Sequence, residues 1–143
     1  MARLSIKMPA QFLAGFQIPV RITDINYGNH TGNHAFIEII HEARMKWLRQ
    51  FGYTELDIEG SGLIMSDLAI EFLKESFYGD IIEVKIGAGE IGRASFELLY
   101  QLQTQRNNET ILLAKAKTGM VCYDYEAGKV VSVPEKLKAL LIA

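Results

Sequence analysis

The sequence has few of the residues that mark special structural classes: its 143 residues include one cysteine, three prolines and one tryptophan. One cysteine excludes a disulfide framework within the chain, and Cys122 lies in the apolar run KTGMVCYDY, which is typical of a buried, reduced thiol. Low-complexity segments, internal repeats and linkers rich in proline or serine are also missing. Residues 1–143 are therefore predicted to form a single domain.

An excess of charge of one sign is missing too. Fifteen basic residues stand against seventeen acidic ones without a basic block, which disfavours a nucleic-acid-binding surface. No run reaches the roughly 18 apolar residues of a membrane-spanning helix, and Pro9, Gln11 and Gln17 interrupt the N-terminal segment where a signal peptide would have its core. Together with the reduced cysteine, these absences predict a cytoplasmic protein that binds neither nucleic acid nor membrane.

The first strong pattern is an alternation of apolar and polar side chains over residues 16–22, which predicts a strand with one buried face. Asp24 continues the buried side of this alternation. Loss of water around a carboxylate disfavours its charged form and raises its pKa. We therefore expect Asp24 to lie at the end of the strand, at the edge of the core, with a raised pKa.

A long helical pattern follows over residues 33–52, with Asn33 predicted as its N-cap and Gly52 as its C-cap. The remainder alternates in segments separated by turns, which predicts a meander of four or five long antiparallel strands. Pro134 opens a short C-terminal helical segment at its first position. One sheet curling around one helix is an α+β arrangement. A single helix covers little sheet, so we expect a homo-oligomer.

Two features resemble ligand-binding motifs without their context. Residues 87–92 spell G-x-G-x-x-G, but they join two alternating strands, which predicts a glycine-rich turn or bulge rather than a dinucleotide site. His34, Glu38 and His41 share a helix face, but no H-E-x-x-H motif is present. We expect capping and surface histidines here, and neither a metal nor a cofactor.

The segment TDINYGNHTGNHAFIEIIHEAR, residues 23–44, crowds polar groups at the strand-to-helix joint. A turn from Tyr27 to Gly32 leads into the helix, whose first N–H groups would lie beside Asp24. Such donors can hold the oxyanion formed when a carbonyl is attacked, at roughly 3 kcal/mol per donor, and a carboxylate can act as nucleophile or general base. A turn that merely caps the helix is the alternative, and the spacing leaves both open.

The segment RITDINYGNHTGNHAFIEIIHEARMKWLRQFG resembles the opening of 4-hydroxybenzoyl-CoA thioesterase-like and acyl-ACP thioesterase-like proteins. Asp24, His30, Asn33, the Glu42–Arg44 segment and Gly52 occupy the positions of that pattern. The resemblance extends over nearly the whole chain. It implies the hotdog fold, in which a curved antiparallel sheet wraps around one long central helix and chains pair into dimers.

The chain departs from this pattern at two places. Gly28 and Asn29 are exchanged relative to the usual Asn-Gly order, and one asparagine of the usual pair is lost. Asn26 stands where the plant acyl-ACP enzymes carry a second acid, which favours Asp24 as the working carboxylate.

The resemblance implies an acyl-CoA thioesterase that needs no cofactor, with acyl-CoA or acyl-ACP as substrate and a homodimer or homotetramer as its assembly. Asp24 is expected to be nucleophile or general base, and backbone N–H groups near Thr31 to Asn33 the oxyanion donors. A non-catalytic acyl-CoA-binding hotdog module and an enoyl-CoA hydratase-like enzyme are the alternatives. The expected catalytic residues are Asp24, His30, Thr31 and Gly32, and the expected substrate contacts are Tyr27, Asn33 and Arg93.

Overall fold

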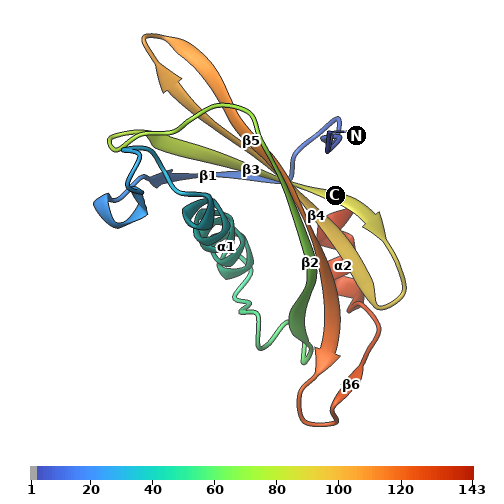
Figure 1. The fold of residues 1–143 in the computed structure, drawn as a ribbon. Coiled ribbons are helices and arrows are strands. Elements are labelled where there is room, and N and C mark those ends of the chain that lie inside the picture. Colours follow the sequence, from blue (N-terminus) through green and yellow to red (C-terminus); the bar gives the residue numbers. More distant parts are fainter. Residues whose placement is uncertain (1–2) are drawn as a thin grey trace.

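The computed structural model describes residues 3–143, which form one curved sheet and two helices (Figure 1). The elements in chain order are β1 (Ala14–Pro19), a 3-10 turn η1 (Ile22–Asp24), α1 (Asn33–Arg49), β2 (Gly62–Phe72), β3 (Ile81–Ile91), β4 (Ser95–Arg106), β5 (Glu109–Asp124), β6 (Lys129–Val130) and α2 (Glu135–Leu141).

The strands are hydrogen-bonded in the order β1-β3-β4-β5-β2, all antiparallel, and β6 pairs with β5. The predicted meander is correct for β3, β4 and β5. It is wrong for β2, which pairs with β5 rather than with the strand that follows it, so that β1 and β2 form the two edges. Alternation of side chains marks a strand but carries no information on its neighbour, which is why the order was missed.

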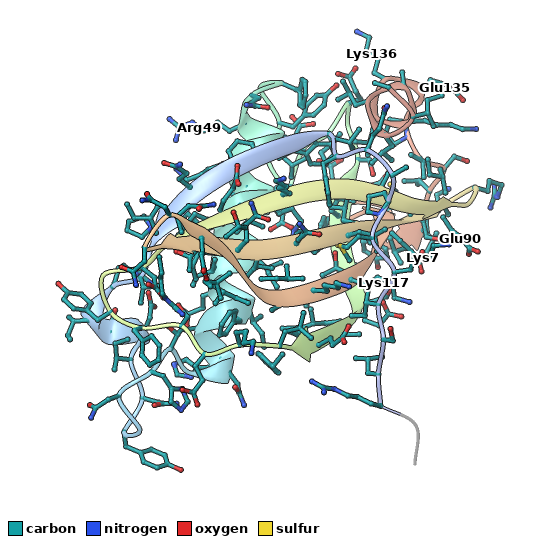
Figure 2. All side chains as sticks on the ribbon, turned by 90° about the horizontal axis from the view of Figure 1, so that it is seen from above. Lys7, Arg49, Glu90, Lys117, Glu135 and Lys136 are labelled. Atoms are coloured by element: carbon teal, nitrogen blue, oxygen red, sulfur yellow. The ribbon has the colours of Figure 1, made fainter. Side chains whose placement is uncertain are left out.

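Helix α1 lies in the curve of the sheet, with β1 on one side and β2 on the other (Figure 1). Phe36, Ile40, Ala43 and Trp47 are buried against the strands, as their helical spacing predicts. Seen from above, the strands pass over α1, and Arg49, Glu135 and Lys136 lie at the periphery of the fold (Figure 2). This arrangement is the α+β hotdog architecture that the resemblance implies.

The joint before α1 differs from the prediction. β1 ends at Pro19, and the chain then turns through η1, so Asp24 closes a 3-10 turn instead of ending a strand. The Arg21 backbone N–H donates to the Asp24 carboxylate at 2.8 Å, and the Val20 N–H donates to the Asp80 carbonyl in a loop. The Val20 bond continues the β1–β3 register by one residue, and the pairing ends at Arg21, whose N–H is taken up by the turn.

The helix ends also lie slightly away from their predicted places. Gly32 occupies the N-cap of α1 without a side-chain cap, and Asn33 is the first helical residue, so the prediction of an Asn33 cap is wrong by one position. At the other end Gln50 is the C-cap, so the prediction of a Gly52 cap is wrong by two positions, although Gly52 has φ +76°, a conformation that glycine tolerates best. Pro134 is the N-cap of α2 rather than its first residue.

Two sequence features have the outcome expected of them. The glycines of residues 87–92 lie in β3 and its turn into β4, with a register shift between Ala88 and Ile91, as predicted for a glycine-rich turn or bulge. Cys122 is buried, and burial raises the pKa of its thiol. Within residues 3–143, no helix is both long and apolar enough to cross a membrane.

One ion pair fastens the loop between β2 and β3 to β4. The Arg106 Nη2 group donates to Asp80 Oδ2 at 2.6 Å, and the same carboxylate accepts from the Ser76 hydroxyl at 3.0 Å and the Phe77 N–H at 2.9 Å. Burial raises the pKa of Asp80, but the hydrogen bonds and the charge of Arg106 outweigh it and hold the pKa below its usual value. The ionised carboxylate therefore stabilises the loop.

Replacing Asp80 by asparagine should lower the free energy of unfolding at pH 7 by about 1–3 kcal/mol, because the charge-assisted bonds are lost. The folded pKa is depressed, so this stabilisation is present above the unfolded value of about 3.9 and is lost as the pH falls through the lower folded pKa. Urea unfolding of both proteins at pH 7 and near pH 2 measures it.

Glu109→Gln, at an exposed position, is the matched control and should leave stability unchanged. A difference between wild type and Asp80→Asn that stays constant down to pH 2 would contradict this role for the carboxylate.

Candidate active site

Asp24 is buried, with 2% of its surface exposed, beside the start of α1. Among residues 3–143, the hydrogen bonds to its side chain all come from Arg21: the backbone N–H at 2.8 Å, Nη2 at 3.1 Å and Nε at 3.4 Å. Asp24 also lines a cavity of about 510 Å³ between β1 and α1, here named the Asp24 cavity. It is lined by Gln17, Ile18, Pro19, Arg21, Asp24, Glu38, Ile39, His41, Glu42, Met45 and Lys46.

The charge state of Asp24 is set by two opposing effects. Burial raises the pKa of its carboxyl group, but the hydrogen bonds and the positive charge of Arg21 outweigh it, and the pKa lies below its usual value. The prediction of a raised pKa is therefore wrong, because the basic side chain three residues earlier was left out of account. Asp24 is ionised at neutral pH and is a weak base.

His30, Thr31 and Asn33 lie on the other side of the helix start and line a cavity of about 220 Å³, here named the helix-start cavity. Its remaining walls are Phe36, Phe72, Leu73, Lys74 and Glu75. The His30 ring lies 3.4 Å from the Asn26 side-chain amide and 3.3 Å from the Thr31 carbonyl oxygen. The structure thus places Asp24 in one cavity and His30 and Thr31 in another, whereas Gly32 lines neither of them.

The backbone donors of this turn are partly in use. The Thr31 N–H donates to the Ser76 carbonyl at 2.7 Å, and the Gly32 N–H donates to the Asp24 carbonyl at 2.9 Å. Among residues 3–143 the N–H groups of Asn33 and His34 have no hydrogen-bond acceptor. The donors free to bind a ligand therefore begin at Asn33, the last residue of the stretch predicted to supply them.

Comparison with known proteins identifies the family. A model of the thioesterase-like superfamily matches residues 20–141. The chain belongs to this superfamily. An acyl-CoA thioesterase of Haemophilus influenzae is 26% identical to it over 130 residues, which cover 87% of this chain and 93% of the relative. A 1,4-dihydroxy-2-naphthoyl-CoA hydrolase of Microcystis aeruginosa is 31% identical over 105 residues, which cover 71% of this chain and 73% of the relative.

A solved structure agrees with the fold. A variant of 4-hydroxybenzoyl-CoA thioesterase complexed with 4-hydroxybenzoyl-CoA superposes with a TM-score of 0.79 at 16% identity, over 90% of this chain and 97% of its own. The predicted hotdog fold and membership in this superfamily are confirmed. The prediction of a thioester hydrolase is confirmed at the level of the family.

Two expected substrate contacts lie away from both cavities. Tyr27 is fully exposed at the tip of the turn before α1. Arg93 lies in the turn between β3 and β4, where its guanidinium group is 3.5 Å from the Ser132 hydroxyl. The whole of β3 separates Arg93 from the loop beside the helix start, so Arg93 lies far from both cavities.

The histidines of α1 do not gather into a metal centre in the structure. His41 Nε2 lies 2.7 Å from a carboxylate oxygen of Glu55. Across residues 3–143, no three His, Cys, Asp or Glu side chains lie together in a way that could hold a metal ion.

One polar cluster of this thioesterase domain was missed from the sequence. Arg44, within the EAR segment, is buried on the inner face of α1 and donates to Glu55 at 2.8 Å and to the Tyr100 hydroxyl at 3.2 Å. The Tyr100 and Thr118 hydroxyls are 2.8 Å apart. Arg44 follows Ile40 at helical spacing, so a charged residue on the apolar stripe was the available signal.

The hydroxyl group of Thr31 is buried without a hydrogen-bond partner, which destabilises the fold. Its oxygen is the single buried side-chain polar atom without such a partner among residues 3–143. A buried polar group without a partner destabilises a fold by roughly 1–3 kcal/mol. The first turn of the helix is thus held by the backbone of Thr31 and is not helped by its side chain.

Replacing Thr31 by valine, which has nearly the same shape, should raise the free energy of unfolding by about 1 kcal/mol, because the unpaired hydroxyl is removed. Chemical denaturation of the two proteins measures the difference. Thr31→Ser keeps the hydroxyl and serves as the control, which should gain nothing. A loss of stability in Thr31→Val would mean that the hydroxyl has a partner in solution.

Proposed function

We propose that this protein hydrolyses acyl-CoA thioesters to the free acid and CoA. The observation that carries the proposal is the pair of unpaired N–H groups of Asn33 and His34 at the start of a 17-residue helix, next to two cavities. The positive end of a helix dipole favours an oxyanion at this place. The names of the related acyl-CoA thioesterase and naphthoyl-CoA hydrolase support CoA as the carrier.

In this mechanism the thioester carbonyl oxygen accepts hydrogen bonds from Asn33 and His34. A water oxygen attacks the carbonyl carbon while its proton passes to a base, the carbonyl electrons move onto the oxygen, and the N–H groups stabilise the resulting oxyanion. Collapse of this intermediate breaks the C–S bond, and CoA leaves as a thiolate that then takes up the proton. A thiol has a pKa near 8.5, so it is a good leaving group.

Asp24 is the proposed base, or the nucleophile if it attacks the carbonyl carbon directly. Its burial beside the helix start and its place in the wall of the Asp24 cavity support the assignment. Oδ2 accepts two hydrogen bonds from Arg21 and Oδ1 accepts one, so Oδ1 keeps a lone pair that can take a proton or attack a carbonyl. The exposure of the Arg21 side chain, 63%, leaves it room to move.

His30 is a second candidate for the base. It shares the helix-start cavity with Asn33, whereas Asp24 lines the cavity on the opposite side. Asn26 and the Thr31 carbonyl lie near the same ring nitrogen and can orient the ring. If His30 is the base, Asp24 serves to hold Arg21 and the turn.

Release of free thiol from a panel of acyl-CoA and acyl-ACP substrates tests these proposals. Asp24→Asn should lower kcat by about 10²- to 10⁴-fold, because the group that accepts the proton or attacks the carbonyl is lost. His30→Gln should cost much less. The reverse result would assign the base to His30, and no turnover combined with tight acyl-CoA binding would favour the non-catalytic binding module.

Arg21→Gln is the control that separates catalysis from structure. Because Arg21 lowers the pKa of Asp24, its loss raises that pKa, and the acidic limb of the pH–rate profile should move to higher pH. If the acidic limb of the pH–rate profile does not move, and Arg21→Gln loses as much stability as Asp24→Asn, the Arg21–Asp24 pair serves only the structure.

We also propose that the protein is a homodimer or homotetramer. β2 is an 11-residue edge strand with partly exposed apolar side chains, among them Ile64, Met65 and Phe72. An exposed edge of this kind is normally covered. Light scattering should give a mass that is a multiple of 16.1 kDa. Met65→Lys should reduce that mass by weakening the assembly, whereas a monomeric wild type would contradict the proposal.

A further inference from the structure

The side chain of His34, in the first turn of α1, folds back over the N-cap residue Gly32. A methyl group built on Gly32 would come within 2.7 Å of the His34 Cε1 atom and within 2.9 Å of its Nδ1 atom. Non-bonded atoms do not approach this closely, so the imidazole ring occupies the space in which any other residue would place its Cβ atom. Gly32 therefore admits the ring to this position.

The backbone at Gly32 does not itself require a glycine. Its φ of −70° and ψ of 155° lie in the extended region that is open to every residue. Gly32 is also the position at which the chain has lost one asparagine of the pair that is usual in the family pattern. The loss of that asparagine thus makes room for a ring that a side chain at this position would exclude.

The ring of His34 is close enough to Asp24 for the two side chains to interact. Burial raises the pKa of the Asp24 carboxyl group, the hydrogen bonds and charge of Arg21 lower it, and the positive charge of His34 lowers it further. Gly32, on which the ring rests, donates its N–H to the Asp24 carbonyl at 2.9 Å. The carboxylate and the imidazole therefore flank the same N-cap.

The nitrogen atoms of this ring are not used by the protein. His30 Nδ1 lies 3.4 Å from the Asn26 side-chain amide, and His41 Nε2 lies 2.7 Å from a carboxylate oxygen of Glu55. The ring of His34 has no such partner among residues 3–143. Of the histidines in the described chain, His34 is thus the one whose ring nitrogens are both free to exchange a proton.

Asp24 and His34 differ in their access to water. Asp24 has 2% of its surface exposed, whereas the His34 side chain is exposed. CoA is large and highly charged, so its transfer into an apolar interior would be costly and it must leave on the open side of the site. The exposed imidazole lies on that open side, and the buried carboxylate lies on the side of the protein interior.

We propose that the imidazolium group of His34 donates a proton to the sulfur of CoA as the C–S bond of the thioester breaks. The inference rests on the proposed function and deepens it, because it assigns the proton that the leaving group takes up. The C–S electron pair moves onto sulfur, which takes the proton from the ring and leaves as a neutral thiol. Asp24, which has accepted the proton of the attacking water, passes it to the neutral ring, and both groups return to their starting state.

This transfer is favourable for an alkyl thiol such as CoA. A thiolate whose thiol has a pKa of about 8.5 is a stronger base than an imidazole, whose conjugate acid has an ordinary pKa of about 6.5. An aryl thiolate is a weaker base than an alkyl thiolate and leaves without a proton. The contribution of a proton donor therefore depends on the leaving group, which makes it measurable.

The test compares two thioesters of the same acyl group, one formed with CoA and the other with an aryl thiol. His34→Gln should lower kcat for the CoA thioester by about tenfold to a hundredfold, the lower part of the usual range for a general acid because a thiolate leaves readily. For the aryl thioester the loss should stay below about threefold. The substitution keeps the backbone N–H of residue 34, so the oxyanion donors are the same in both proteins.

Gly32→Ala moves the ring without removing it. Its methyl group takes the place of the ring edge, so this variant should show the same selective loss on the CoA thioester as His34→Gln. Gly92→Ala is the matched control, because a methyl group there lies 3.5 Å from its nearest neighbours, an ordinary contact. It should leave both reactions unchanged. Full activity of Gly32→Ala on the CoA thioester would overturn the proposal.

The outcomes separate this role from the proposed function. Equal losses on the two thioesters in His34→Gln, or no loss on either, would overturn the role of His34 while the hydrolase activity stands. A wild type that hydrolyses neither thioester would overturn the proposed function and this role together. The ring position is checked without substrate by NMR: the α-protons of Gly32 should show a ring-current shift that disappears in His34→Gln, and its absence in the wild type would overturn the placement.

Discussion

Two backbone hydrogen bonds hold the first turn of α1, and the rest of the site depends on them. The Thr31 N–H reaches the carbonyl of Ser76 in the loop after β2, and the Gly32 N–H reaches the carbonyl of Asp24 in the turn after β1. The helix start is thereby fixed between loops that follow the two edge strands of the sheet. These bonds use the N–H groups of Thr31 and Gly32, so those of Asn33 and His34, at the positive end of the helix dipole, are left without an acceptor among residues 3–143.

The parts of the fold that depend on local periodicity could be predicted from the sequence. Phe36, Ile40 and Trp47 were correctly placed on the inner face of one long helix, and the glycines of residues 87–92 were correctly read as a turn or bulge. The hotdog fold followed from a resemblance that covers nearly the whole chain. The pairing of β2 with β5 did not follow from periodicity, because alternation of side chains identifies a strand but not the strand with which it pairs.

The details of the site could be predicted less well, for reasons that can be named. Asp24 was correctly expected to be buried, but its low pKa comes from Arg21, whose guanidinium group folds back only because the chain turns at η1. The use of the Thr31 N–H by Ser76 joins residues 45 positions apart, and no local pattern contains that contact. Arg44 was overlooked because a charged residue in an apolar stripe is usually taken as an exception, and here its partners Glu55 and Tyr100 lie elsewhere in the chain.

The unpaired N–H groups and the buried Arg44 cluster are carried by one rigid element. Because α1 is a continuous 17-residue helix, the distance from the N–H groups at its start to Arg44 is set by the helical rise and is insensitive to the loops. Arg44 is in turn fixed by Glu55 and by the Tyr100 hydroxyl of β4, so the middle of the helix is tied to the sheet. The loops before α1 can therefore adjust without moving the helix, whereas a start held only by those loops would move with them.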